Sequence, residues 1–470
     1  MSASLPVFPW DTLADAKALA GAHPDGIVDL SVGTPVDPVA PLIQEALAAA
    51  SAAPGYPATA GTARLRESVV AALARRYGIT RLTEAAVLPV IGTKELIAWL
   101  PTLLGLGGAD LVVVPELAYP TYDVGARLAG TRVLRADALT QLGPQSPALL
   151  YLNSPSNPTG RVLGVDHLRK VVEWARGRGV LVVSDECYLG LGWDAEPVSV
   201  LHPSVCDGDH TGLLAVHSLS KSSSLAGYRA GFVVGDLEIV AELLAVRKHA
   251  GMMVPAPVQA AMVAALDDDA HERQQRERYA QRRAALLPAL GSAGFAVDYS
   301  DAGLYLWATR GEPCRDSAAW LAQRGILVAP GDFYGPGGAQ HVRVALTATD
   351  ERVAARSDGS PVSANRRNLR PGHRQVVRSW VVTESGLSPR NRSRMACPCG
   401  ESAGSCRGGP MCFRHACARC CRRSLFRANQ RGTACQATVP GSDSPTTART
   451  ANSLRATGRA GGVRILRPMR

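Results

Sequence analysis

The sequence predicts an α/β fold in which a mainly parallel central sheet is flanked by helices, followed by a smaller α+β unit and a disordered basic tail. Three observations predict it. Short, continuously apolar runs alternate with amphipathic segments as far as about residue 256. Beyond that point the pattern changes to one long helical stretch followed by short strand-like runs. The composition then changes abruptly at residue 357.

The apolar runs in the first part of the chain end at Gly, Pro, Ser or Asn, as buried strands commonly do. Segments with helical apolar spacing lie between them. This alternation is the pattern of a parallel sheet covered on both faces, and such sheets bind ligands beyond the C-terminal ends of their strands. The expected strands are 87–91, 111–114, 149–152, 180–183, 213–216 and 231–234, and the expected helices include 64–77, 95–104, 165–176 and 237–249.

A second unit is expected after Ala256. Its pattern starts with a helical stretch over 258–290 that carries charges on one face. Strand-like runs follow at 304–308, 326–329 and 342–346. The predicted domains are a large domain (41–270), a small C-terminal domain (271–356) that the N-terminal segment 1–40 completes, and the tail (357–470).

The tail differs from the rest of the chain in charge and in cysteine content. Residues 357–470 carry 21 arginines, no lysine and four acids, a net of +17, so residues 1–356 carry −6 of the chain's +11. Eight of the 11 cysteines also lie in the tail. High charge with few large apolar residues predicts disorder. All-arginine basicity is typical of GC-rich DNA read in a shifted frame, and we interpret the tail as aberrant sequence of that origin.

The N-terminus has no basic residue before Lys17 and no apolar segment typical of a signal peptide. We therefore expect neither a signal peptide nor a transit peptide. No run of about 18 apolar residues occurs, so we expect no transmembrane helix. The three scattered cysteines of residues 1–356 favour a reducing compartment. The expected location is the cytoplasm.

Three polar segments directly follow predicted strands. They are Asn-Ser-Pro-Ser-Asn-Pro-Thr-Gly (153–160), Ser-Asp-Glu-Cys-Tyr (184–188) and Ser-Leu-Ser-Lys (218–221), the last with an arginine at 229. Taken singly, the first is an ordinary turn, the second is loop polarity with a helix cap, and Lys221 is an exposed loop lysine. Their common order and position at strand ends indicate one ligand site.

Together the three segments resemble those of the fold-type I pyridoxal-phosphate aminotransferases of class I/II, over about residues 5–356. The resemblance implies that Lys221 condenses with the cofactor aldehyde and then moves a proton between the substrate Cα and the cofactor. It implies that Asp185 pairs with the pyridinium nitrogen, and that Asn157 and Tyr188 bind the phenolic oxygen of the ring. The implied cofactor is pyridoxal 5′-phosphate.

The resemblance also implies a phosphate site and a stacking aromatic. Ser218, Ser220 and Arg229 would bind the phosphate, and backbone amides at a helix N-terminus would assist them. Tyr119 matches an aromatic residue that stacks on the cofactor ring, although a packed core tyrosine is the alternative. The helix start is Gly92-Thr93-Lys94, which by itself is also a common turn.

The resemblance gives two further residues a role in binding the substrate and one residue a contact with a neighbouring subunit. Arg343 would bind the α-carboxylate of the amino acid, with Asn157 beside it, and Gly33 would let the backbone approach that carboxylate. An arginine in a short strand is otherwise a solvated edge residue. Tyr56 matches a tyrosine that reaches the phosphate of the neighbouring subunit, so a homodimer with shared active sites is expected.

The resemblance implies amino transfer between glutamate/2-oxoglutarate and another amino/keto acid pair. Overall similarity points to N-succinyl-LL-2,6-diaminopimelate, a compound of lysine biosynthesis, as the amino acid of that pair. The alternatives are a C–S β-lyase that uses the same lysine and a non-catalytic nucleic-acid binder that uses the basic tail. Cys417-x-x-Cys420, with Cys397, Cys399 and His415 nearby, has irregular spacing and no hydrophobic pattern around it, so we expect no metal site there.

Overall fold

The computed structural model describes residues 5–357, and the side chains of residues 5–353. The basic tail, with its cysteine motif and the alternative of nucleic-acid binding that depends on it, therefore lies outside the described residues. None of the helices within the described range is long and apolar enough to cross a bilayer.

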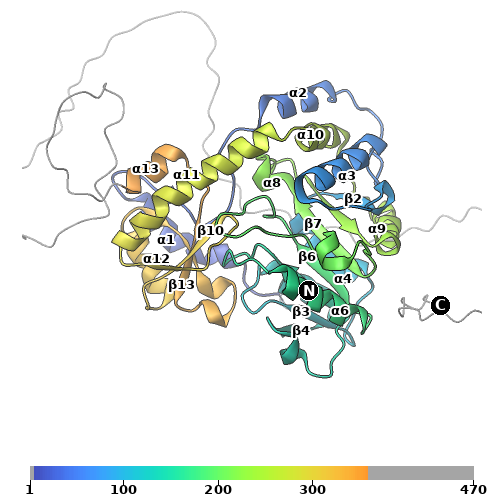
Figure 1. The fold of residues 1–470 in the computed structure, drawn as a ribbon. Coiled ribbons are helices and arrows are strands. Elements are labelled where there is room, and N and C mark those ends of the chain that lie inside the picture. Colours follow the sequence, from blue (N-terminus) through green and yellow to red (C-terminus); the bar gives the residue numbers. More distant parts are fainter. Residues whose placement is uncertain (1–4, 358–470) are drawn as a thin grey trace, which may run out of the picture. The chain divides into compact units, whose positions relative to one another are not determined.

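The central feature is a seven-stranded sheet with the strand order β2-β8-β7-β6-β5-β3-β4 (Figure 1). It is mainly parallel, as predicted, but β8 is antiparallel to both β2 and β7. Only the four-residue helix α8 (Leu219–Ser222) lies between β7 and β8, and a parallel pair needs a longer crossover connection. The strands are β2 (Val87–Val90), β3 (Leu111–Val114), β4 (Arg132–Arg135), β5 (Leu149–Asn153), β6 (Leu181–Asp185), β7 (Leu213–Ser218) and β8 (Gly231–Gly235).

Helices cover both faces of this sheet, because the strands are apolar on both sides. Along β7, Leu213 and Ala215 pack into one core, whereas Leu214 and Val216 pack into another. The first core includes α3 (Ala63–Tyr77), α6 (Val165–Arg176), α7 (Pro203–Cys206) and α10 (Ala256–Asp267). The second includes α4 (Thr93–Leu103), α5 (Thr121–Leu128) and α9 (Leu237–Ala250), and α2 (Pro41–Ala49) packs beside α10 (Figure 1).

A third core forms around a four-stranded antiparallel sheet with the order β12-β13-β10-β9. The N-terminal part of the chain joins this region, since β1 (Val28–Asp29) pairs in parallel with β11 (Ile326–Leu327). The other elements are α1 (Ala14–Gly21), α11 (Ala270–Ser292), β9 (Ala296–Asp298), β10 (Tyr305–Thr309), α12 (Cys314–Ala322), β12 (Ala329–Pro330), β13 (His341–Ala345) and α13 (Asp350–Ser357).

Two predicted elements are wrong in their extent. The stretch 258–290 is not one helix: α10 ends at Asp267 and α11 starts at Ala270. Asp268 has an extended backbone and its carboxylate accepts the backbone N–H of His271 at 2.8 Å, so it caps the start of the second helix. The run 326–329 is split between β11 and β12, which belong to different sheets.

The short edge strand β4 was not predicted. Its sequence is Arg-Val-Leu-Arg, and its residues are half-buried or exposed. A strand that pairs on one side only does not need the continuous apolar run by which the central strands are recognised.

A buried ion pair joins α4 to α9. The side chain of Arg247 is fully buried, and its Nη1 and Nη2 atoms each donate to a carboxylate oxygen of Glu95 at 3.1 Å. Removing the carboxylate would leave an arginine charge without a partner in the interior.

We predict that Glu95→Ala lowers the free energy of unfolding by about 3 kcal/mol or more, because it strands the Arg247 charge. The measurement is urea denaturation followed by tryptophan fluorescence. Arg64→Ala is the matched control, since the Arg64–Asp267 pair is largely exposed, and it should cost less than about 1 kcal/mol. Equal losses in the two variants would contradict the assignment.

Candidate active site

A cavity of about 700 Å³ opens where β6 and β7 end, within the size range of small-molecule sites. It brings together residues from the N-terminal segment, the central sheet and the second sheet. Most of the predicted site residues line it. The lining includes Gly33, Thr93, Lys94, Tyr119, Asn157, Asp185, Tyr188, Ser218, Ser220, Lys221, Arg229 and Arg343.

Lys221 lies on the short helix α8, directly after β7. The Ser218 hydroxyl accepts the backbone N–H of Ser220 at 3.1 Å and so caps this helix. The Lys221 Nζ atom donates to the backbone carbonyl of Gly33, and Tyr279 donates its hydroxyl to the Lys221 carbonyl at 3.1 Å. Burial lowers the pKa of Lys221, which increases the share of neutral, nucleophilic amine.

Asp185 is the last residue of β6, and its carboxylate is buried. Tyr122 donates to Oδ2 at 2.8 Å, and the backbone N–H of Cys187 donates to Oδ1 at 3.2 Å. Burial is the main cause of a raised pKa at this carboxyl. Within residues 5–353 it has no cationic partner, so a cationic ring nitrogen placed in the cavity would stabilise its charged form. The site therefore fits a protonated pyridine ring.

The residues predicted for the phosphate gather at the start of α4. Gly92 has φ +89°, and a Cβ built there would lie 2.1 Å from Nη2 of Arg229. Only glycine therefore lets this arginine lie against the first turn of the helix. Burial and then the charge of Arg229 lower the pKa of Lys94. A helix N-terminus beside an arginine and two serines suits a phosphate dianion.

Arg343 is buried on β13 rather than solvated at a strand edge. Its Nη1 donates to Oδ1 of Asn157 at 2.8 Å, and its Nη2 donates to the Ser31 carbonyl at 2.7 Å. Its Nε is buried without a hydrogen-bond partner among the described residues. A buried guanidinium with neutral partners is suited to an anionic ligand such as a carboxylate.

Two predicted tyrosines line the cavity and a third does not. Tyr119 packs edge-on against Tyr122 at 5.8 Å, and burial raises its pKa to about 12. The Tyr188 hydroxyl lies 3.0 Å from that of Tyr305. Tyr56 is 99% exposed and is not part of the lining. Its predicted contact involves a neighbouring subunit and stays a prediction.

Several lining or supporting residues escaped the sequence reasoning. Tyr122 lies in the first turn of α5 and donates to Asp185, and its ring meets that of Tyr119, which precedes the helix, edge-on. Asn153 accepts the backbone N–H of Asn157 at 2.7 Å and was visible in the same polar segment. Phe8, Trp10 and Tyr305 come from distant parts of the chain, and no local pattern marked them.

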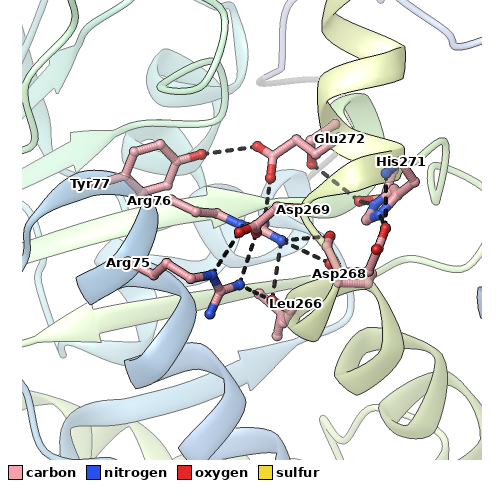
Figure 2. A network of polar contacts seen from close by, with 11 residues as sticks. Arg75, Arg76, Tyr77, Leu266, Asp268, Asp269, His271 and Glu272 are labelled. Carbon is pink, nitrogen blue, oxygen red and sulfur yellow. Dashed lines mark hydrogen bonds and ion pairs between the residues drawn. The ribbon is translucent and has the colours of Figure 1, made fainter.

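A polar network surrounds the junction of α10 and α11 (Figure 2), and one of its members, His271, also contacts the segment that follows Lys221. His271 lies 2.9 Å from the Ser223 hydroxyl through Nε2 and 2.7 Å from Asp268 through Nδ1. Asp269 accepts from Arg75 at 2.7 Å and from Arg76 at 2.6 Å. These contacts connect the junction of α10 and α11 both to α3 and to the segment after Lys221, and so limit the freedom of that segment.

Glu186 and His217 lie directly behind the cavity, next in sequence to Asp185 and Ser218. Their side chains are buried and approach to 3.6 Å. Burial raises the pKa of Glu186 to about 7 and lowers that of His217 to about 3, so both groups are neutral near pH 6. The contact is therefore a pair of neutral groups rather than an ion pair.

We predict that Glu186→Gln removes the decrease in the free energy of unfolding that the Glu186 carboxyl causes as the pH rises. The unfolded state releases the Glu186 proton near the ordinary glutamate pKa, whereas the folded state holds it to about pH 7. The contribution of Glu186 to stability should thus fall between these two pH values, by roughly 3 kcal/mol at most, and stay level above them. The opposite contribution of His217, whose pKa is lowered, is common to variant and wild type and cancels in their difference. Glutamine keeps the acceptor for the Val200 N–H.

The measurement is the thermal unfolding midpoint from pH 4.5 to about pH 8. The difference between variant and wild type should grow in favour of the variant as the pH rises. A difference that does not change with pH would contradict the prediction.

Comparisons with known proteins agree with this geometry. The sequence profile of the family "Aminotransferase class I and II" matches residues 25–356. The 4-dedimethylamino-4-oxo-anhydrotetracycline transaminase OxyQ of Streptomyces rimosus is 60% identical over 351 residues, covering 75% of this chain and 98% of that protein. An LL-diaminopimelate aminotransferase of Dehalococcoides mccartyi is 30% identical, covering 74% and 94%. The solved structure of a "probable N-succinyldiaminopimelate aminotransferase" from Thermus thermophilus superposes with a TM-score of 0.67 at 29% identity, covering 74% and 98%.

Proposed function

Because the chain belongs to the class I and II aminotransferases, a family whose members use pyridoxal phosphate, we propose that it transfers an amino group from glutamate to the ring ketone of a tetracycline-type polycycle. The observation that carries the proposal is the 60% identity to OxyQ over nearly the whole of that protein. The diaminopimelate aminotransferases mentioned above are about half as similar.

The residues of the cavity suit amino transfer. The bound cofactor supplies an electron sink for the carbon that carries the amino group. Lys221 would hold it covalently and would act as the base that moves the proton at that carbon. Asp185 would pair with the ring nitrogen, and Arg229 with the start of α4 would hold the phosphate. Arg343 would bind the glutamate carboxylate.

The aromatic lining supports a flat, polycyclic acceptor. Phe8 is 49% exposed and lines the cavity, with the Lys94 ammonium 5.0 Å from its ring centroid. The ring of Trp10 lies 5.5 Å from that of Phe8 and 5.5 Å from that of Phe333. Aromatic rings left exposed at a cavity favour a ligand that covers them. A fused-ring ketone has the flat apolar faces to do so.

The structural comparison supports a second candidate acceptor, the keto acid that corresponds to N-succinyl-LL-2,6-diaminopimelate. The chain superposes on the Thermus thermophilus protein named above over 98% of that protein's length. That similarity supports N-succinyl-LL-2,6-diaminopimelate as the amino compound of the reaction, as expected from the sequence. The buried guanidinium of Arg343 suits either pair, because both use glutamate as the other partner.

The test compares acceptors with the purified holoenzyme and glutamate. One arm contains 4-dedimethylamino-4-oxo-anhydrotetracycline, the other contains the keto acid that corresponds to N-succinyldiaminopimelate, and aminated product is measured by mass spectrometry. Amination of the polycycle at a higher kcat/KM supports the proposal. A higher kcat/KM for the keto acid would instead identify that keto acid as the acceptor and contradict the proposed polycyclic substrate. Release of pyruvate and ammonia from cystathionine without a keto acid would indicate the lyase.

We predict that Lys221→Ala lowers kcat by roughly 10³-fold or more, because the amine that would act as the base is lost. The visible absorbance of the covalently held cofactor should disappear as well. Lys170→Ala, an exposed lysine of α6, is the matched control and should behave as wild type. Amino transfer that survives in the Lys221 variant would refute the role of this residue.

We predict that Phe8→Ala raises KM for the polycyclic ketone about tenfold, which is ~1.4 kcal/mol and the scale of one aromatic stack. KM for glutamate should change by less than about twofold, since the rings that contact Arg343 are those of Trp10, Tyr305 and Tyr334. Val7→Ala, at a neighbouring side chain that is 72% exposed, is the control. Steady-state kinetics with each substrate varied separately distinguish the two effects, and an equal rise in both KM values would count against an aromatic platform.

We further propose that the active enzyme is a cytoplasmic homodimer in which Tyr56 reaches the neighbouring site. The almost complete exposure of this tyrosine supports the idea, because an aromatic side chain so exposed gains from burial against a second copy.

A further inference from the structure

Tyr305, at the start of β10, contacts three of the predicted site residues although no local pattern singled it out. Its hydroxyl lies 3.0 Å from that of Tyr188. The same hydroxyl sits against Gly33, where a built Cβ would lie 2.2 Å from it. The carbonyl of Gly33 in turn accepts from Lys221. The Arg343 guanidinium lies 3.9 Å from the centroid of the Tyr305 ring.

Burial makes the hydroxyl contact significant. Tyr305 is 4% exposed and Tyr188 is 7% exposed, so neither phenol can rely on water for its hydrogen bond. The two rings meet nearly edge-on, with their centroids 5.6 Å apart, and their hydroxyls lie 3.0 Å apart. The geometry is that of a hydrogen bond between two enclosed groups.

We propose that Tyr305 is a positioning residue whose hydroxyl donates to Tyr188, so that the Tyr188 hydroxyl is oriented and polarised to donate to the phenolic oxygen of the bound cofactor. A hydroxyl in such a chain is a stronger donor than an isolated one, because each hydrogen bond polarises the next. Stronger donation stabilises the deprotonated, anionic form of that oxygen. The inference rests on the cofactor and family assignment and is independent of which ketone is the substrate.

Other titratable groups also surround Tyr305, and they come from several elements. Lys221 on α8 and Arg343 on β13 are the basic groups among them, whereas the remaining neighbours are phenols. The titratable groups close enough to interact electrostatically with Tyr305 are Tyr119, Tyr188, Lys221, Tyr279, Tyr334 and Arg343. None of these changes in Tyr305→Phe, so the substitution isolates the hydroxyl.

The test is a pH titration of the visible absorbance of the holoenzyme without substrate. Tyr305→Phe should raise the midpoint by about half a pH unit, roughly a threefold change in proton affinity. Tyr188→Phe should raise it at least as much, and Tyr305→Phe should add nothing in the Tyr188→Phe background. Tyr334→Phe is the matched control: its ring also lies near Arg343, at 5.0 Å, but its buried hydroxyl has no partner among the described residues.

A midpoint in Tyr305→Phe equal to that of wild type or of Tyr334→Phe would overturn the proposal. So would an unchanged midpoint in Tyr188→Phe, which removes the same hydrogen bond from the other side and remains informative if Tyr305→Phe fails to fold. Equal effects of Tyr305→Phe with and without the Tyr188 hydroxyl would also overturn it. If wild type shows no cofactor absorbance, the family-based function fails, which is a separate result from an unshifted midpoint.

Discussion

The site depends on the register of three neighbouring parallel strands. Asn153 of β5 pairs with Asp185 of β6, and Asp185 pairs with Val216 of β7, two residues before Ser218. Because parallel strands end at the same edge of a sheet, this register brings the polar residues after each strand to one place. A shift by one residue would turn the Asp185 carboxylate toward the opposite face, where helices pack on the sheet.

The chemistry of the cavity follows from the burial of charges without full compensation. Asp185 receives two neutral donors and Arg343 two neutral acceptors. Each of these charges is therefore held in a fixed orientation while its net charge remains available to a ligand. A cationic ring near Asp185 would neutralise that charge at one end of the cavity, and a carboxylate near Arg343 would neutralise the charge at the other end. Lys221, with its lowered pKa, lies between these ends with its amine on the Gly33 carbonyl.

The N-terminal segment contributes to the site because it is attached to the second sheet region. The pairing of β1 with β11 places Ser31 and Gly33 next to Arg343 and Lys221. Arg282 of α11 binds Asp37 at 2.5 Å and Asp350 at 2.7 Å, so one buried arginine connects this segment to the start of α13. The site thus includes chain segments about 300 residues apart in sequence, as Arg343 and Ser31 show.

The sequence by itself determined the central strands, the helices that cover them and the polar residues that follow β5, β6 and β7. Continuous apolar runs and strong turn residues are local signals, so they are readable without a structure. The break at Asp268, the antiparallel direction of β8 and the edge strand β4 were decided by tertiary pairing and capping. Tertiary structure alone also placed Phe8, Trp10 and Tyr305 at the cavity. An aromatic residue has the same local pattern in a core as in a binding site, and only the packing of distant segments distinguishes the two.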